Sequence, residues 1–259
     1  MKMTYDEYIQ NPMGIKNSVI SNREMYRSLY VGKLDKILVR EVGKVKYFLY
    51  KDKNNFYVHM KVPSEVVDRF YYDTVIQFYT DKSELVVSRT LNDYYVNFYS
   101  NDPSFVFTFA HAFIKNDIFI KDLEPKMSKL AIKKNADIKN PTNQVGYVKS
   151  LYFAYLLMKQ YGLFNKIQYE TNASKYDKKQ FLNQIEHADT KIQKRQEEEE
   201  EQKKKKRIEK TKFQTVTQVR NQEFSTAQSS RTKKVGIVGN VTSTVKTKTA
   251  GVIEKIKRH

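Results

Sequence analysis

The stretch KVKYFLYKDKNNFYVHMKV, residues 44–62, contains two runs with strand character and a short polar turn between them. Valine, tyrosine and phenylalanine are frequent in both runs, and these side chains fit the pleated surface of a strand. The turn DKN is short enough for a tight hairpin. The run LDKILVRE (34–41) precedes them across a VG pair. We therefore predict a three-stranded antiparallel meander over about residues 34–62.

The runs VIQFYT (75–80) and DYYVNFYS (93–100) add two predicted strands to this sheet. Before the sheet, TYDEYIQ predicts a short helix because Thr4 and Glu7 have the spacing of a capping box. In that motif each side chain accepts a hydrogen bond from the backbone N–H of the other residue. NREMYRSLY (22–30) predicts a second short helix.

The second half of the chain is predicted to be mainly helical. An Asn-Asp-Pro-Ser entry leads into the helix SFVFTFAHAFIK (104–115), and NQVGYVKSLYFAYLLMKQYG (143–162) forms the strongest helix, with Gly162 as its C-terminal cap. DLEPKMSKLAIKK (122–134) predicts a third helix, whose apolar side is formed by Leu123, Met127 and Leu130. The predicted fold class is α+β, with an antiparallel or mixed sheet and helices packed on it.

The composition changes near residue 170. Nearly all bulky apolar side chains precede this point, so we predict a globular domain over residues 1–172. A charged helical spacer is predicted over 173–212, and its thin apolar stripe of Phe181, Ile185 and Ile192 is enough to dock the start of a helix. A basic low-complexity tail over 213–259 has few core-sized side chains, and we expect it to be extended.

The spacer contains QEEEEEQKKKKRIEK, residues 196–210. Glutamates 199–201 each precede a lysine by four residues, which is the favourable order for an i,i+4 ion pair on a helix. No bulky apolar residue occurs between Ile192 and Ile208, so a coiled-coil seam is excluded there. The pattern predicts a solvated helix.

Enzymatic constellations are not found in this sequence. Cysteine is absent, and the four histidines have no metal-ligand spacing. The fragment GIVGN (236–240) lacks the strand–turn–helix context of a phosphate-binding loop. We predict no catalytic residue, no metal and no cofactor, and therefore a protein that is not an enzyme.

The positive charge is concentrated at the C-terminal end. The chain has a formal net charge of +18, and from Lys203 onward 16 lysines and arginines face three carboxylates. Such clusters neutralise phosphates and release counterions. The alternatives are a lysine-rich tail that only confers solubility and a segment inserted into a protein partner. The candidate contact residues are Lys203, Lys204, Lys205, Lys206, Arg207, Lys233, Lys234, Lys255, Lys257 and Arg258.

Aromatic side chains occupy both faces of the predicted strands. Aromatic rings beside lysines can stack nucleic-acid bases. Rings on both faces are more typical of a sheet with one face in the core and the other in an interface, where tyrosine is favoured. We favour the interface and take Tyr95 and Tyr99 as its candidate docking residues.

Four segments resemble proteins encoded by tailed bacteriophages: TYDEYIQNPMG, YKDKNNFYVHMKVPSE, FYSNDPSFVFTFAHAF and KSLYFAYLLMKQYGLF. The resemblance covers about residues 1–170 and implies a virion or assembly component. Its partners would be other virion proteins or further copies of itself, with DNA as a partner of the basic tail.

The alternative is a free nucleic-acid-binding protein that acts on DNA or RNA during infection. Under either hypothesis we expect no membrane partner, because the longest apolar run, LYFAYLLM (151–158), is shorter than a membrane span. The expected location is the host cytoplasm during assembly, or the virion itself.

Overall fold

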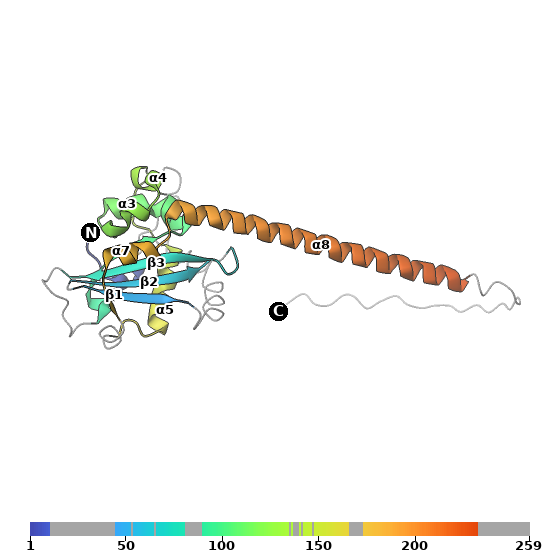
Figure 1. The fold of residues 1–259 in the computed structure, drawn as a ribbon, viewed down its shortest axis with the longest axis horizontal. Coiled ribbons are helices and arrows are strands. Elements are labelled where there is room, and N and C mark those ends of the chain that lie inside the picture. Colours follow the sequence, from blue (N-terminus) through green and yellow to red (C-terminus); the bar gives the residue numbers. More distant parts are fainter. Residues whose placement is uncertain are drawn as a thin grey trace, which may run out of the picture. The chain divides into compact units, whose positions relative to one another are not determined.

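Of the 259-residue chain, the computed structural model describes residues 1–10, 45–52, 54–64, 66–80, 90–134, 136, 140, 142–146, 148–165 and 173–232. The chain divides into two compact units, Met1–Lys203 and Lys204–His259. The first unit contains a mixed sheet and packed helices, which confirms the predicted α+β class (Figure 1).

The sheet has five strands in the order β4-β3-β2-β1-β5. The first four pair with their sequence neighbours in antiparallel fashion, and β5 pairs in parallel with β1. The strands are β1 (Tyr47–Lys51), β2 (Asn55–Pro63), β3 (Tyr71–Tyr79), β4 (Tyr95–Ser100) and β5 (Ser174–Lys175). Four predicted strands are thus confirmed, whereas the segments 22–30 and 34–41 lie outside the described residues.

The hairpin between β1 and β2 closes at Asp52. Its carboxylate accepts hydrogen bonds from the backbone N–H groups of Asn54 at 2.8 Å and Asn55 at 2.7 Å. This side-chain-to-backbone turn explains why the DKN sequence ends one strand and starts the next. The turn fixes the register, in which Lys51 lies opposite Phe56 and Tyr47 opposite Met60.

Helices α1 and α5 begin and end at the expected types of residue. Thr4 and Glu7 form the predicted capping box before α1 (Tyr5–Gln10): the Thr4 N–H donates to Glu7 at 2.7 Å, and the Glu7 N–H donates to Thr4 at 3.2 Å. Helix α5 (Lys149–Gln160) ends before Gly162, which adopts φ 63°. Only glycine takes this left-handed conformation without strain, so the predicted C-terminal cap is confirmed.

The remaining described helical segments are the single-turn η1 (Leu91–Asp93), the π-helical turn η2 (Phe105–Phe109), α3 (Ala110–Lys115), η3 (Lys121–Lys126), α4 (Lys129–Lys133), α7 (Lys178–Gln184) and α8 (Ala188–Thr232). The predicted helix over 104–115 is confirmed. The predicted single helix over 122–134 is wrong. The chain leaves the helical conformation at Met127, and Leu130 is 75% exposed instead of joining Leu123 in the core.

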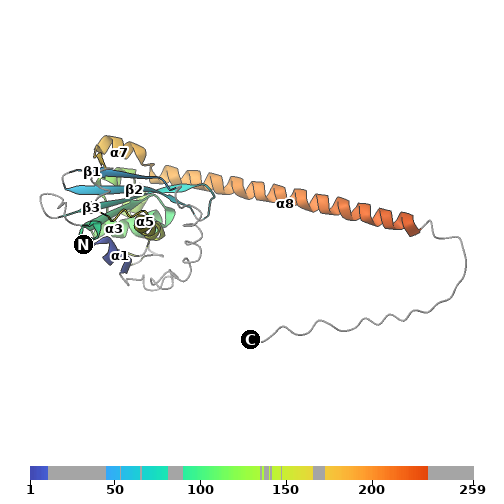
Figure 2. The ribbon, with the colours of Figure 1, turned by 90° about the horizontal axis from the view of Figure 1, so that it is seen from below.

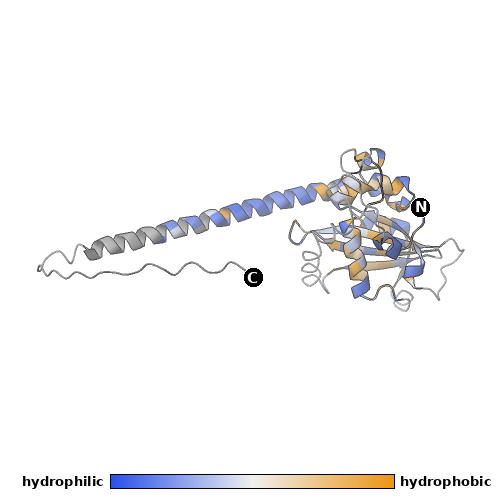
Figure 3. Cartoon of the chain, turned by 180° about the vertical axis from the view of Figure 1, so that it is seen from behind, coloured by the Kyte–Doolittle hydropathy of each residue, from blue (hydrophilic) through white to orange (hydrophobic). Residues whose placement is uncertain are grey.

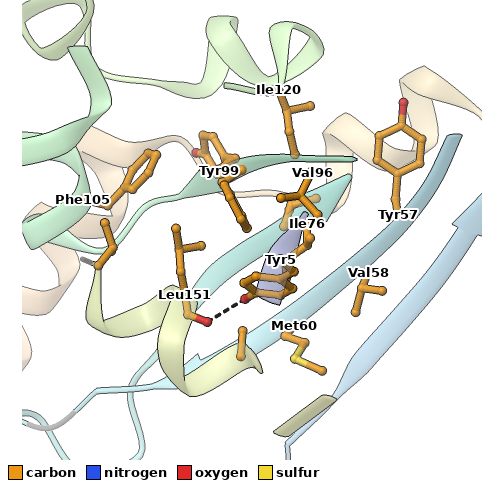
Figure 4. Packing of buried hydrophobic residues seen from close by; sticks show 14 of the residues in the cluster. Tyr5, Tyr57, Val58, Met60, Ile76, Val96, Tyr99, Phe105, Ile120 and Leu151 are labelled. Atoms are coloured by element: carbon orange, nitrogen blue, oxygen red, sulfur yellow. Dashed lines mark hydrogen bonds between the residues drawn. The ribbon is translucent and has the colours of Figure 1, made fainter. Parts of the chain in front are cut away.

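Helices lie on both faces of the sheet. Helices α1 and α5 pack on one face and α7 on the other, with the strands between them (Figures 1 and 2). On the α5 face, Tyr5 of α1 is fully buried, and its hydroxyl donates to the backbone carbonyl of Leu151 at 2.6 Å. Figure 4 shows this bond beside Met60, with Tyr57 and Tyr99 on the other side of the strands.

The first unit extends past the boundary predicted at residue 172. Phe181 of α7 and Ile192 of α8 are 0% and 7% exposed, and both belong to the central core. The apolar stripe predicted to dock a helix therefore contributes to the domain itself. Helix α8 continues to Thr232, so residues 213–232 are helical instead of extended, whereas residues 233–259 lie outside the described part.

Candidate functional site

The first group of predicted contact residues lies on α8. The side chains from Lys203 to Arg207 are all exposed. The predicted i,i+4 ion pair between Lys203 Nζ and Glu199 is present at 2.7 Å, and Glu199 also pairs with Arg195 at 3.0 Å, which was not predicted. These pairs support the helix through side chains on its own surface.

Helix α8 carries no apolar seam where it is charged. Ile208 is 55% exposed, and most residues that Figure 3 colours along the helix after its first turns are hydrophilic. The segment therefore presents cations to solvent, as predicted. The other predicted contact residues, Lys233, Lys234, Lys255, Lys257 and Arg258, lie outside the described residues.

The two predicted docking tyrosines differ in their exposure. Tyr99 is fully buried: its ring packs against Phe119, and its hydroxyl donates to the backbone carbonyl of Lys126 at 3.3 Å. The prediction of Tyr99 as a surface residue is therefore wrong, because η3 covers this part of β4. Burial also raises the pKa of Tyr99 well above its ordinary value. Tyr95 is half-buried, 5.7 Å from the ring of Tyr79.

The first compact unit contains a basic pocket that the sequence did not predict. The pocket has a volume of ≈ 400 Å³. Four cationic side chains and two aromatic ones line it: Lys46, Lys61, Arg69, Phe70, Tyr71 and Lys191. We call this set the basic pocket. Lys61 and Lys191 each have a carboxylate partner, so the pocket carries an excess of about two positive charges, which a bound anion would balance.

The strand register brings the first cations together. The backbone N–H of Lys61 donates to the carbonyl of Lys46 at 3.0 Å, so these residues face each other across the hairpin. On the other side of β2, Lys61 pairs with Asp73 of β3. Three charged residues thus form one cross-strand row, and two of them, Lys46 and Lys61, line the pocket.

Asp73 is the buried anchor of this row. One of its carboxylate oxygens lies 2.7 Å from His59 Nε2 and also accepts a hydrogen bond from Lys61, and the other accepts from Asn101 Nδ2 at 3.0 Å and from the Glu186 N–H at 3.3 Å. Burial alone would raise the pKa of Asp73, but the hydrogen bonds and charges of His59 and Lys61 outweigh it and hold that pKa well below its ordinary range.

Lys191 of α8 enters the pocket from the helical layer. Only 12% of its side chain is exposed, its Nζ atom lies 3.0 Å from Glu186, and it also lies 4.5 Å from the ring centre of Phe70. Burial opposes ionisation of Glu186, but its hydrogen bonds with Lys194 and Lys191 lower its pKa below the ordinary value. The Lys191 ammonium is therefore held in place by a carboxylate and an aromatic ring.

Arg69 closes the turn that connects β2 to β3. It adopts φ 59°, a left-handed conformation that a side chain with a Cβ atom takes at a cost of about 1–2 kcal/mol. The adjacent backbone is fixed, since the Ser64 N–H donates to the Phe70 carbonyl at 2.7 Å. Within the part of the chain that the structure describes, neither Lys46 nor Arg69 has a carboxylate partner.

The buried histidine does not form an open catalytic centre. His59 is 0% exposed, and its ring lies between Phe48 at 5.5 Å and Phe181 at 6.3 Å. Across the described ranges, no group of three or more histidine, cysteine, aspartate or glutamate side chains is arranged to hold a metal ion. None of the described helices is both long enough and apolar enough to cross a membrane.

The sequence contains part of the signal for the basic pocket. The spacing of His59 and Lys61 puts both polar side chains on one face of an otherwise apolar strand, and the DKN turn sets Lys46 opposite Lys61. The contributions of Arg69 and Lys191 depend on a strained turn and on helix docking, for which the sequence has no local pattern.

Comparison of the chain with protein-family models, with curated proteins and with solved structures found no match in any of the three. The assignment of a function therefore rests on the residues of this chain.

Proposed function

We propose that this protein is a non-catalytic structural or assembly protein of a tailed bacteriophage. Its compact unit docks on other virion proteins or on further copies of itself, and its basic C-terminal region contacts a partner or packaged DNA. It acts in the host cytoplasm during assembly or within the virion. The resemblance of the four quoted segments to phage proteins supports the choice of system.

The observation that carries the proposal is the exposed basic segment of α8. Lys203 to Arg207 are five consecutive cations, all exposed, on a helix that needs no apolar partner. A surface of this kind suits phosphate backbones, whose contacts are electrostatic and independent of sequence. The excess of 16 cations over three carboxylates from Lys203 onward extends the same charge along the chain.

Because Tyr99 is buried, another part of the first compact unit must form the docking surface. Tyr47 and Phe48 of β1 are each 39% exposed, which is high for rings on a strand. Aromatic side chains are frequent in protein interfaces because they bury a large apolar area at a low entropic cost. Successive residues of a strand point to opposite faces of the sheet, so the two rings are two separate candidate contacts for virion proteins, one on each face.

A free nucleic-acid-binding protein is the second candidate function. The basic pocket favours it, because this pocket belongs to the compact unit and not to the C-terminal region. Under this alternative, loss of the pocket cations would weaken binding to DNA or RNA. Under the structural proposal, the pocket would be unnecessary for contact with long nucleic acids.

The test is binding of duplex DNA and of RNA at several salt concentrations by three full-length variants. The triple substitution Lys204→Gln, Lys206→Gln and Arg207→Gln removes three cations from α8 and keeps side chains that favour a helix. The control triple, Lys115→Gln, Lys129→Gln and Lys133→Gln, removes three exposed cations from α3 and α4. The third variant, Lys46→Gln with Arg69→Gln, probes the pocket.

If α8 contacts phosphates, its triple variant should lower the slope of log K against log salt by about 3, because each lost phosphate contact changes the slope by about 0.9. The control should leave the slope unchanged. Equal slopes for both triple variants would exclude the α8 segment as the contact. A decrease confined to the pocket variant would favour the free nucleic-acid-binding protein.

A further inference from the structure

We propose that the basic pocket is a binding site for a phosphate monoester. This inference goes beyond the proposed function, because the pocket lies in the compact unit and its ligand would be recognised one phosphate at a time. The shared chemistry is a terminal phosphate group, which either a small phosphorylated molecule or the phosphorylated end of a nucleic-acid strand can supply.

The charges of the pocket favour a monoester over the diester of a continuous strand. Two of the four cations are already opposed by carboxylates: Lys61 by Asp73 and Lys191 by Glu186. Lys46 and Arg69 are the remaining two, without such partners among the described residues. A monoester carries a charge of about −1.5 to −2 at pH 7 and would balance both cations, whereas a diester carries one charge.

Carboxylates hold two of the four pocket cations in place before a ligand arrives. Asp73 and Glu186 fix the ammonium groups of Lys61 and Lys191, so little side-chain entropy remains to be lost when they bind. Arg69 is held by the short β2–β3 turn in a strained conformation, and such strain occurs frequently at binding sites. A guanidinium at this place suits the forked geometry of phosphate oxygens.

The dimensions of the pocket leave room for more than the phosphate. Its volume of ≈ 400 Å³ lies within the range of about 300–1,000 Å³ that is usual for sites of small organic ligands. Phe70 and Tyr71 line the same cavity. The esterified group would therefore pack against aromatic side chains while the phosphate contacts the cations.

The experiment is calorimetric titration of the full-length protein at fixed ionic strength. The probes are inorganic phosphate, adenosine 5′-monophosphate, adenosine, and a short single-stranded oligonucleotide with either a 5′-phosphate or a 5′-hydroxyl end. The pocket variant is Lys46→Gln with Arg69→Gln. The matched control is Lys129→Gln with Lys133→Gln, which removes two exposed cations of α4 from the same unit.

The wild-type protein and the control should bind the monophosphate more tightly than adenosine, and the pocket variant should bind it at least about tenfold more weakly, because it lacks both cations that have no carboxylate partner. Affinity should also fall as pH drops below about 6, where the monoester loses its second charge. Equal affinities for adenosine and its monophosphate, or equal affinities of the two variants, would overturn the proposal.

The oligonucleotides distinguish the two sources of the phosphate. If the 5′-phosphate raises the affinity of the oligonucleotide for the wild-type protein but not for the pocket variant, the site binds strand ends. If the monophosphate binds but the 5′-phosphate does not raise the affinity of the oligonucleotide, the site binds a small molecule. The α8 triple variant should retain its affinity for the monophosphate. If the α8 proposal fails, the α8 triple variant will show an unchanged salt dependence with long DNA, and the result with the monophosphate will stand independently of it.

Discussion

The two faces of the central sheet bury different chemistry. On the face toward α5, Met60, Ile76 and Phe98 are all 0% exposed. The contacts there are mainly apolar apart from the buried hydroxyl groups of Thr74, Ser100 and Ser150. On the face toward α7, His59 and Asp73 are equally inaccessible, yet both are polar. The two faces therefore differ in their contribution. The α5 face supplies most of the hydrophobic stabilisation, and the α7 face holds charged side chains in fixed positions next to the surface.

The polar face extends beyond the basic pocket. Asn97 donates to Gln77 at 3.1 Å, and Gln77 donates to Asn55 at 2.9 Å, so amides form a ladder across three strands. Buried polar groups of this kind are stable only when their hydrogen bonds are made. The effect of a substitution on stability should therefore depend on charge and hydrogen bonding on the α7 face, and on side-chain volume on the α5 face.

The largest effect is expected for Asp73→Asn. The substitution keeps the shape of the side chain but leaves the Lys61 ammonium without its buried carboxylate, and breaking a buried pair in this way costs about 3–5 kcal/mol. Urea unfolding of the variant and the wild-type protein would measure the difference in the free energy of unfolding.

The matched control is Asp117→Asn, which breaks the exposed pair with Lys121 at 3.1 Å. Exposed pairs contribute about 0–1 kcal/mol, so the control should remain close to the wild type. If Asp73→Asn lowered the free energy of unfolding no more than this control, the polar face would contribute no more to stability than a solvated surface.

A second prediction concerns the stability of the protein at low pH. The folded-state pKa of Asp73 lies below its ordinary value of 3.8. Its contribution to stability is therefore fully present above about pH 4 and is lost as pH falls through the folded-state pKa. Thermal unfolding between pH 2 and pH 6 should show a steeper acid loss in the wild type than in Asp73→Asn. If the melting temperatures of the two proteins fell equally with pH, other carboxylates would account for the acid sensitivity.

The smallest effect is expected for Arg69→Gly. Glycine adopts φ 59° without strain, which favours the folded state by about 1–2 kcal/mol, while the greater freedom of glycine in the unfolded chain offsets about 0.5–1 kcal/mol. The variant should therefore be as stable as the wild type or more stable by about 1 kcal/mol, and it should bind the phosphate monoester more weakly. Loss of stability together with binding would show that Arg69 has a structural role.

The sequence predicts the local elements of this fold better than its long-range contacts. The β1–β2 hairpin, the capping box at Thr4 and the C-terminal cap at Gly162 depend on neighbours in the chain, and all three are confirmed. The exposure of Leu130 and the burial of Tyr99 depend on which segment covers them, and both predictions were wrong. Helical or strand periodicity does not contain that information.

The end of the first compact unit at Lys203 lies beyond the boundary predicted at residue 172 for the same reason. Phe181 and Ile192 are isolated apolar residues in a charged sequence, so composition assigned them to a spacer. In the folded chain they fill gaps beside the sheet, where Phe181 lies 5.2 Å from the ring of Tyr50. The exposed lysines of α8 were predictable because solvated charge needs no partner, whereas the basic pocket requires residues from four separate segments.

The five consecutive cations of α8 have a consequence for how a partner is recognised. Successive residues of a helix point about 100° apart, so Lys203 to Arg207 surround the helix axis instead of forming one stripe. A helix that reads bases must turn one particular side toward a groove, but this helix presents the same charge in every direction. If the proposed contact with a polyanion is made, it would not require one particular side of the helix, and rotation about the helix axis would change it little.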